Sequence, residues 1–148
     1  MKQLPPPIWA LLILGTTYAL SLTPPLGELP SFQNTPLAIA LIVLGLIAPV
    51  WAFSLFRAAG TQISPTSQTN NKLVVTGPFQ LTRNPMYLGL VIITLGAAIW
   101  IGRPLVFATP VLMFAIANWV HIPFEEAKMR RQFGAEFDAY CARVRRWL

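Results

Sequence analysis

The chain has 148 residues, of which 55% are hydrophobic and only 11% are charged. A soluble domain of this length needs more charge to cover its surface, so the composition predicts a membrane protein. The formal net charge of +6 fits basic loops on the cytoplasmic side of a bilayer better than a phosphate-binding face, and we expect no nucleic-acid partner.

Four apolar stretches predict an all-α integral membrane fold with about four transmembrane helices in a single membrane domain, residues 1–148. The spans are expected at about 8–22, 37–56, 86–101 and 104–124. The first stretch is short and also resembles the core of a signal peptide. We expect it to be retained as a helix, because its loss would leave an odd-numbered bundle.

The third and fourth stretches are separated only by Gly102 and Arg103, which predicts a tight antiparallel hairpin. Basic residues gather in the segment 57–85 and in the tail after Phe124, whereas Arg103 stands alone on the other side. The positive-inside rule therefore predicts a cytoplasmic loop at 57–85 and two cytoplasmic termini. We expect the plasma (inner) membrane.

The loop and the tail have features of their own. The polar part of the loop, 60–71, is expected to be irregular, and 72–76 is a β-prone run before the turn signal Gly77-Pro78. The tail, 125–148, is predicted to be an amphipathic interfacial helix interrupted near Gly134. Its apolar residues recur at steps of three and four: Phe133, Phe137, Tyr140, Val144 and Trp147.

A helix start that can bind a ligand is predicted at Arg83-Asn84-Pro85. Asn84 can cap the free amides of the first turn, and Pro85 suits the first helical position. Spare amide donors at a membrane–water boundary can hold a polar or anionic small molecule. Alternatively, Arg83 only reaches lipid headgroups and Tyr87 only anchors the helix at the interface.

Two adjacent acids, Glu125 and Glu126, lie where the fourth span meets the interface. They can hold a cationic or amino-bearing ligand, or Glu126 can form an ordinary helix salt bridge to Arg130. His121 lies one turn before Glu125 and can bond to it. With one cysteine and one histidine, a Cys- or His-rich metal site is excluded, and we expect no metal.

The pieces GPFQLTRNPMYLG and EEAKMRRQFGAEFDAYCARVRRWL resemble integral-membrane methyltransferases of the isoprenylcysteine carboxyl methyltransferase and phospholipid methyltransferase superfamily. The resemblance covers about the second half of the chain, and its parts occur in the family's order. It implies an S-adenosyl-L-methionine-dependent methyltransferase of the EC 2.1.1 type. The implied acceptor is lipid-like or isoprenoid and takes the methyl group on a carboxylate, thiol or amine.

The resemblance also implies the site residues. The candidate cofactor contacts are Arg83, Asn84, Pro85, Tyr87, Gly89, Glu125 and Glu126, together with the neighbouring His121. Arg83 and Tyr87 are the candidate catalytic residues: Arg83 would orient a carboxylate, and Tyr87 or Trp119 would face the sulfonium through a cation–π contact. Eukaryotic relatives commonly have His where this chain has Asn84, which can bond but cannot ionise.

Two other classes stay open at this point. A nicotinamide-dependent membrane reductase of the steroid-reductase type shares a similar helical layout. A non-catalytic membrane module would use the same blocks only as interfacial anchors. Binding of S-adenosylhomocysteine or of NADPH separates these classes.

Overall fold

The structure is a computed structural model in which residues 4–58, 60 and 72–148 are described. In this part of the chain every regular element is a helix, and there is no strand. Its elements are α1 (Pro6–Ser21), η1 (Leu26–Glu28), α2 (Thr35–Ala58), η2 (Gly77–Gln80), α3 (Pro85–Ile101), η3 (Pro104–Phe107), α4 (Ala108–Ile116), η4 (Ala117–His121), α5 (Ile122–Phe133) and α6 (Ala135–Arg143). The all-α prediction is confirmed.

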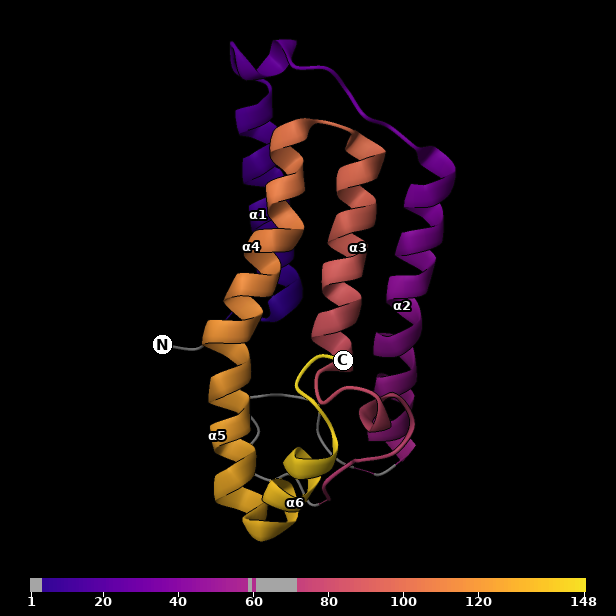
Figure 1. The fold of residues 1–148 in the computed structure, drawn as a ribbon, viewed down its shortest axis with the longest axis vertical. Coiled ribbons are helices and arrows are strands. Elements are labelled where there is room, and N and C mark those ends of the chain that lie inside the picture. Colours follow the sequence, from indigo (N-terminus) through magenta and orange to yellow (C-terminus); the bar gives the residue numbers. More distant parts are fainter. Residues whose placement is uncertain (1–3, 59, 61–71) are drawn as a thin grey trace.

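The long helices stand side by side, and α4, η4 and α5 follow one another as one rod (Figure 1). α3 packs against both α2 and α4, and α1 packs against α4. Two helices, Thr35–Ala58 and Pro104–Phe133, are long and apolar enough to cross a membrane by length and composition. The other two apolar helices, α1 and α3, have 16 and 17 residues, so the number of four spans stays a prediction.

The predicted hairpin between the third and fourth stretches is confirmed. Gly102 ends α3 with φ +73°, a backbone conformation that glycine adopts without steric cost, and its amide bonds to Ala98 O at 2.8 Å. Arg103 follows directly, and the chain turns into η3. The turn lies at the end of the bundle that also holds the end of α1 (Figure 1).

Small residues bring α2 and α3 into close contact. A Cβ on Gly89 would overlap Gly45 O and the Pro49 ring, and a Cβ on Gly96 would lie 2.9 Å from Ala38 O. Glycines on one face let two helix backbones approach each other, which is common in membrane helix pairs. The outer face of α2 is apolar and exposed, for example at Val43 (55%) and Val50 (63%), as expected for contact with lipid.

The loop and the tail depart partly from expectation. The polar segment 61–71 lies outside the described residues, and the β-prone run 72–76 forms no strand, since no other described segment pairs with it. The turn at Gly77-Pro78 is confirmed: Gly77 has φ +60° and starts η2. The tail breaks at Gly134 (φ +50°) as predicted, but its helix ends at Arg143. Trp147 therefore does not continue the helical face.

Candidate active site

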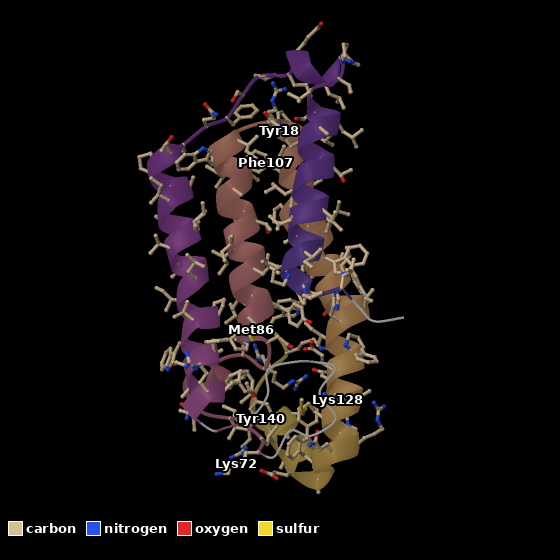
Figure 2. The ribbon with its side chains drawn as sticks, turned by 180° about the vertical axis from the view of Figure 1, so that it is seen from behind. Tyr18, Lys72, Met86, Phe107, Lys128 and Tyr140 are labelled. Carbon is tan, nitrogen blue, oxygen red and sulfur yellow. The ribbon has the colours of Figure 1, made fainter. Side chains whose placement is uncertain are left out.

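Two segments that are distant in the chain meet where α3 begins, at what we call the site end of the bundle. There the non-helical residues 144–148, the tail segment, lie beside residues 82–84, which lead into α3 (Figure 1). Met86 on α3 lies on the same half of the molecule as Lys128 on α5 and Tyr140 on α6 (Figure 2).

Hydrogen bonds fix the tail segment to the start of α3. The Arg83 amide donates to Arg145 O at 3.0 Å, the Thr82 hydroxyl donates to Arg146 O at 3.0 Å, and Asn84 Nδ2 donates to Arg146 O at 2.9 Å. Asn84 thus precedes Pro85 as expected, but its side chain does not cap the helix. The predicted capping bond is wrong because the tail carbonyl takes the Asn84 amide group instead.

The Arg83 side chain is largely enclosed, with 14% of its surface exposed. Its Nη1 donates to Cys141 O at 3.0 Å and to Val144 O at 2.9 Å, at the carboxyl end of α6, where a cation is favoured. Its Nη2 donates to Glu126 Oε1 at 3.0 Å. Its Nε is buried and has no partner among the described residues. Arg83 therefore points into the protein rather than to lipid headgroups.

Glu126 joins Arg83 to the tail segment. Its Oε2 accepts from Arg146 Nη2 at 2.6 Å, and its Oε1 accepts from both Arg83 Nη2 at 3.0 Å and Arg146 Nε at 3.3 Å. The alternative, a salt bridge from Glu126 to Arg130, is not formed, because Arg130 Nε donates to Asp138 Oδ1 at 2.8 Å. Both oxygens of Glu126 are thus held by guanidinium groups of the chain itself.

Glu125 has a different environment. Its Oε1 accepts from the Tyr87 hydroxyl at 2.7 Å, and Tyr87 is only 4% exposed. The His121 ring stacks on the Tyr87 ring, with centroids 5.9 Å apart and planes at 27°. The Trp9 ring packs against the His121 ring in an edge arrangement, with centroids 6.5 Å apart. His121 Nε2 is buried without a partner in the described part of the chain, so Tyr87, not His121, bonds to Glu125.

Three site residues carry weak signals in the sequence. Asn118 Oδ1 accepts from Trp147 Nε1 at 3.1 Å and from Arg146 Nη1 at 3.5 Å, and the Trp147 ring lies 4.7 Å from that of Phe114. Arg146 and Trp147 fall within the predicted interfacial tail helix, and neither they nor Asn118 are among the predicted site residues. An amide within an apolar stretch is the signal that could have identified Asn118, since polar groups in membrane helices usually have a partner.

A widened turn brings Asn118 and His121 to the site. η4 is a π-helix, and Pro123 follows it within the first turn of α5. Proline lacks an amide hydrogen and its ring crowds the carbonyl four residues earlier, so the regular α-helical ladder cannot continue through this point. π-turns of this kind often occur at functional sites.

Not all expected contacts gather here. Arg83, Asn84, Tyr87, His121, Glu125 and Glu126 lie in the connected group described above, and Pro85 is buried at the start of α3. Gly89 instead faces α2, where its missing side chain allows the helices to touch. Trp119 is 70% exposed and cannot face an enclosed ligand. Neither Gly89 nor Trp119 is therefore part of the proposed site.

The loop before α3 is tied to α6 by Tyr140. Its hydroxyl donates to Phe79 O at 2.7 Å, and the two rings pack with Ala52 and Phe137 in one core cluster. Burial raises the pKa of the Tyr140 hydroxyl from 10.0 to about 12, so in the folded protein the group stays protonated and keeps donating up to more alkaline pH than a free phenol. This contact holds the segment that leads to Arg83 against α6.

The charges of the site suit a ligand that has both a positively and a negatively charged group. Glu126 is balanced by Arg83 and Arg146, whereas the bond to Glu125 comes from a neutral hydroxyl. Glu125 is therefore the group suited to a cationic ligand, and Arg83 Nε is a buried donor suited to an anionic one. Among the described residues, no three His, Cys, Asp or Glu side chains form a group that could hold a metal ion.

Comparisons with known proteins identify a family and several relatives. The phospholipid methyltransferase family pattern matches residues 34–136. Protein-S-isoprenylcysteine O-methyltransferase B of Arabidopsis thaliana is 30% identical over 81 residues, which are 52% of this chain and 39% of that protein. A probable protein-S-isoprenylcysteine O-methyltransferase of Oryza sativa subsp. indica is also 30% identical over 81 residues, 52% of this chain and 40% of that protein.

A third relative is shorter. An uncharacterized protein of Haemophilus influenzae is 35% identical over 63 residues, which are 43% of this chain and all of that protein. The match to the named plant proteins, in contrast, spans only about two fifths of their length.

Proposed function

Because the chain belongs to the phospholipid methyltransferase family, we propose that it is a membrane enzyme that transfers a methyl group from S-adenosyl-L-methionine to a lipid-like or isoprenoid acceptor. One structural observation carries the proposal: Tyr87 and Glu125 lie beside the Arg83–Glu126–Arg146 group at the site end. The names of the two plant relatives support methyl transfer, and nothing favours the reductase alternative.

The residues present fit this cofactor. S-adenosyl-L-methionine has an ammonium and a carboxylate on one carbon, and a sulfonium further along. Glu125 would hold the ammonium, while the unpartnered Arg83 Nε would donate to the carboxylate. The stacked rings of Tyr87 and His121 would contact the sulfonium through a cation–π interaction. When bound, the cofactor supplies an electrophilic methyl group.

The two acids would then have separate tasks. Tyr87 fixes the Glu125 carboxylate through a 2.7 Å bond, so that this carboxylate is oriented before a ligand arrives. Glu126 has both oxygens on Arg83 and Arg146, so it holds the tail segment over the start of α3 and excludes water. In-line methyl transfer depends mainly on such alignment and dehydration, and a carboxylate acceptor needs no strong base.

The acceptor would come from the bilayer. The exposed apolar faces of the helices, together with two helices long enough to span, suit a substrate whose chain stays in lipid. Carboxylate, thiol and amine acceptors all remain compatible with the site. We also propose that residues 1–148 form one membrane domain with four spans in the plasma (inner) membrane and both termini in the cytoplasm.

Calorimetry on the purified protein tests the proposal. We expect saturable binding of S-adenosylhomocysteine and, with methyl-labelled cofactor and a total lipid extract, label in the organic phase. The acceptor is then the lipid that carries the label. Binding of NADPH in place of S-adenosylhomocysteine would indicate a reductase. Binding of neither would indicate a non-catalytic module, in which Tyr87→Phe changes only stability.

A further inference from the structure

A second polar feature lies at the end of the bundle opposite the site end. An open pocket of about 330 Å³ is lined there by Tyr18, Gln33, Trp100, Ile101 and Arg103. These residues come from the end of α1, the linker before α2 and the α3–η3 turn. Tyr18 lies at this end, far along the bundle from Met86 and Tyr140 (Figure 2). The candidate active site uses none of these residues.

Arg103 gives this pocket an unbalanced positive charge. It is the one charged residue between Asn84 and Phe124 in the sequence. Its Nη1 donates to Ser21 O, at the end of α1, at 2.8 Å, so a neutral carbonyl holds the guanidinium in place. Glu28 is the other charged residue of this end, and among the described residues no carboxylate pairs with Arg103. The remaining N–H donors of the fork suit a phosphate or carboxylate.

The linker donates to the same turn. Gln33 Nε2 donates to Trp100 O at 3.0 Å and to Ile101 O at 3.2 Å, which satisfies the last carbonyls of α3. The Phe32 amide donates to Gly102 O at 2.7 Å. The backbone around Arg103 is thus bonded within the protein, and the charge of Arg103 is what the pocket offers to a ligand.

The flanking aromatic residues point to a lipid rather than a free anion. Tyr18 and Trp100 are 43% and 49% exposed, and such half-exposed rings are typical of the headgroup level of a bilayer. Leu11 lies seven residues before Tyr18 on the same face of α1 and is 68% exposed, so an apolar surface extends from the pocket towards the membrane interior. One guanidinium also matches the single charge of a phosphodiester.

We propose that the Arg103 pocket binds the phosphodiester headgroup of an anionic phospholipid, with Arg103 as its ligand for the phosphate. Tyr18 and Trp100 flank the headgroup, and the acyl chains lie along the exposed face of α1. The lipid would connect the end of α1 with the α3–η3 turn, which are already joined through Arg103 and Ser21. This site is independent of methyl transfer.

Native mass spectrometry of the full chain, titrated with phosphatidylglycerol or phosphatidylcholine in detergent, tests the proposal. We expect Arg103→Gln to reduce the preference for phosphatidylglycerol about tenfold, the worth of one charge-assisted contact. Arg103→Lys should keep most of the preference. Arg131→Gln, which removes an exposed charge at the site end, is the matched control and should leave the preference unchanged.

Two results would overturn the proposal. The first is an unchanged preference in Arg103→Gln, provided that circular dichroism shows a helical content equal to that of the unmodified protein. The second is displacement of the bound lipid by inorganic phosphate at equal concentration, which would make this a site for the free anion. Neither result bears on S-adenosylhomocysteine binding at the other end.

Discussion

Glu125 and Glu126 are neighbours in the chain, yet their carboxylates bind partners of different charge. Glu125 accepts from a neutral phenol, whereas Glu126 lies between two guanidinium groups. Removing the charge of each acid should therefore have a different effect. Glu125→Gln should weaken S-adenosylhomocysteine binding by about 1.5–3 kcal/mol, the contribution of a charge-assisted hydrogen bond, measured by calorimetry.

Glu126→Gln should mainly lower stability, because it leaves Arg83 and Arg146 without their shared counter-charge. We expect a loss of about 2 kcal/mol, below the range for fully buried pairs, since the Arg146 side chain is 35% exposed. Thermal unfolding in detergent measures this. Asp138→Asn, at an exposed salt bridge, is the matched control for both variants. Equal loss of affinity in all three variants would contradict the division of tasks.

Tyr140 makes the folding stability fall as the pH becomes alkaline. Burial raises the pKa of its hydroxyl from 10.0 to about 12, so the folded state favours the protonated form. The corresponding stabilisation is fully present below pH 10 and is lost as the pH rises from 10 towards 12. Tyr140→Phe, which loses the bond to Phe79 O, should cost about 1 kcal/mol at pH 8 and reduce this alkaline loss. Unfolding free energies measured from pH 8 to 11 test both expectations.

At the scale of helices, the contact between α2 and α3 depends on glycine. Gly89→Ala would push a methyl group into Gly45 O and the Pro49 ring, both of which belong to the facing helix. Overpacking of this kind typically costs about 1–3 kcal/mol. Gly15→Ala is the matched control, since nothing lies within 4 Å of a Cβ there and alanine favours the helix. A stability in Gly89→Ala equal to that of Gly15→Ala would exclude a close contact of α2 with α3.

Helix positions could be predicted because long apolar runs and their breakers are local. α1, α2 and α3 begin and end within two residues of the expected stretches, and Gly102 and Gly134 end helices as expected. The path of the tail could not be predicted from periodicity alone. Its helix ends at Arg143 because the carbonyls of residues 144–146 bond to Arg83, Thr82 and Asn84, some sixty residues earlier.

The same distinction applies to the site residues. The Arg-Asn-Pro and Glu-Glu blocks could be found because the residues that resemble the family follow one another in the sequence. Arg146 and Asn118 could not be assigned, because their roles depend on a partner in another element. Gly89 belongs to the same consecutive block, but the direction in which a helix faces is set by packing, and here Gly89 faces α2.

At the scale of the whole molecule, the structure groups the charged residues at the two ends of the helix bundle as the charge pattern of the sequence predicts. Arg83, Arg130 and Arg146 lie at the site end with the two acids, while Arg103 and Glu28 lie at the other. The positive-inside rule then predicts that the site end faces the cytoplasm. A methyl donor made in the cytoplasm would reach the site without crossing the membrane.

Single-cysteine labelling decides this orientation. In a Cys141→Ser background, Gln80→Cys should react with an impermeant maleimide only in inside-out vesicles, and Glu28→Cys only in right-side-out vesicles or intact cells. Both positions are exposed, so labelling depends on the side of the membrane rather than on burial. Reaction of both cysteines from one side would exclude helices that cross the bilayer between them. The reverse pattern would keep the bundle but place Arg83 and Glu125 away from a cytoplasmic cofactor, which would contradict the proposed function.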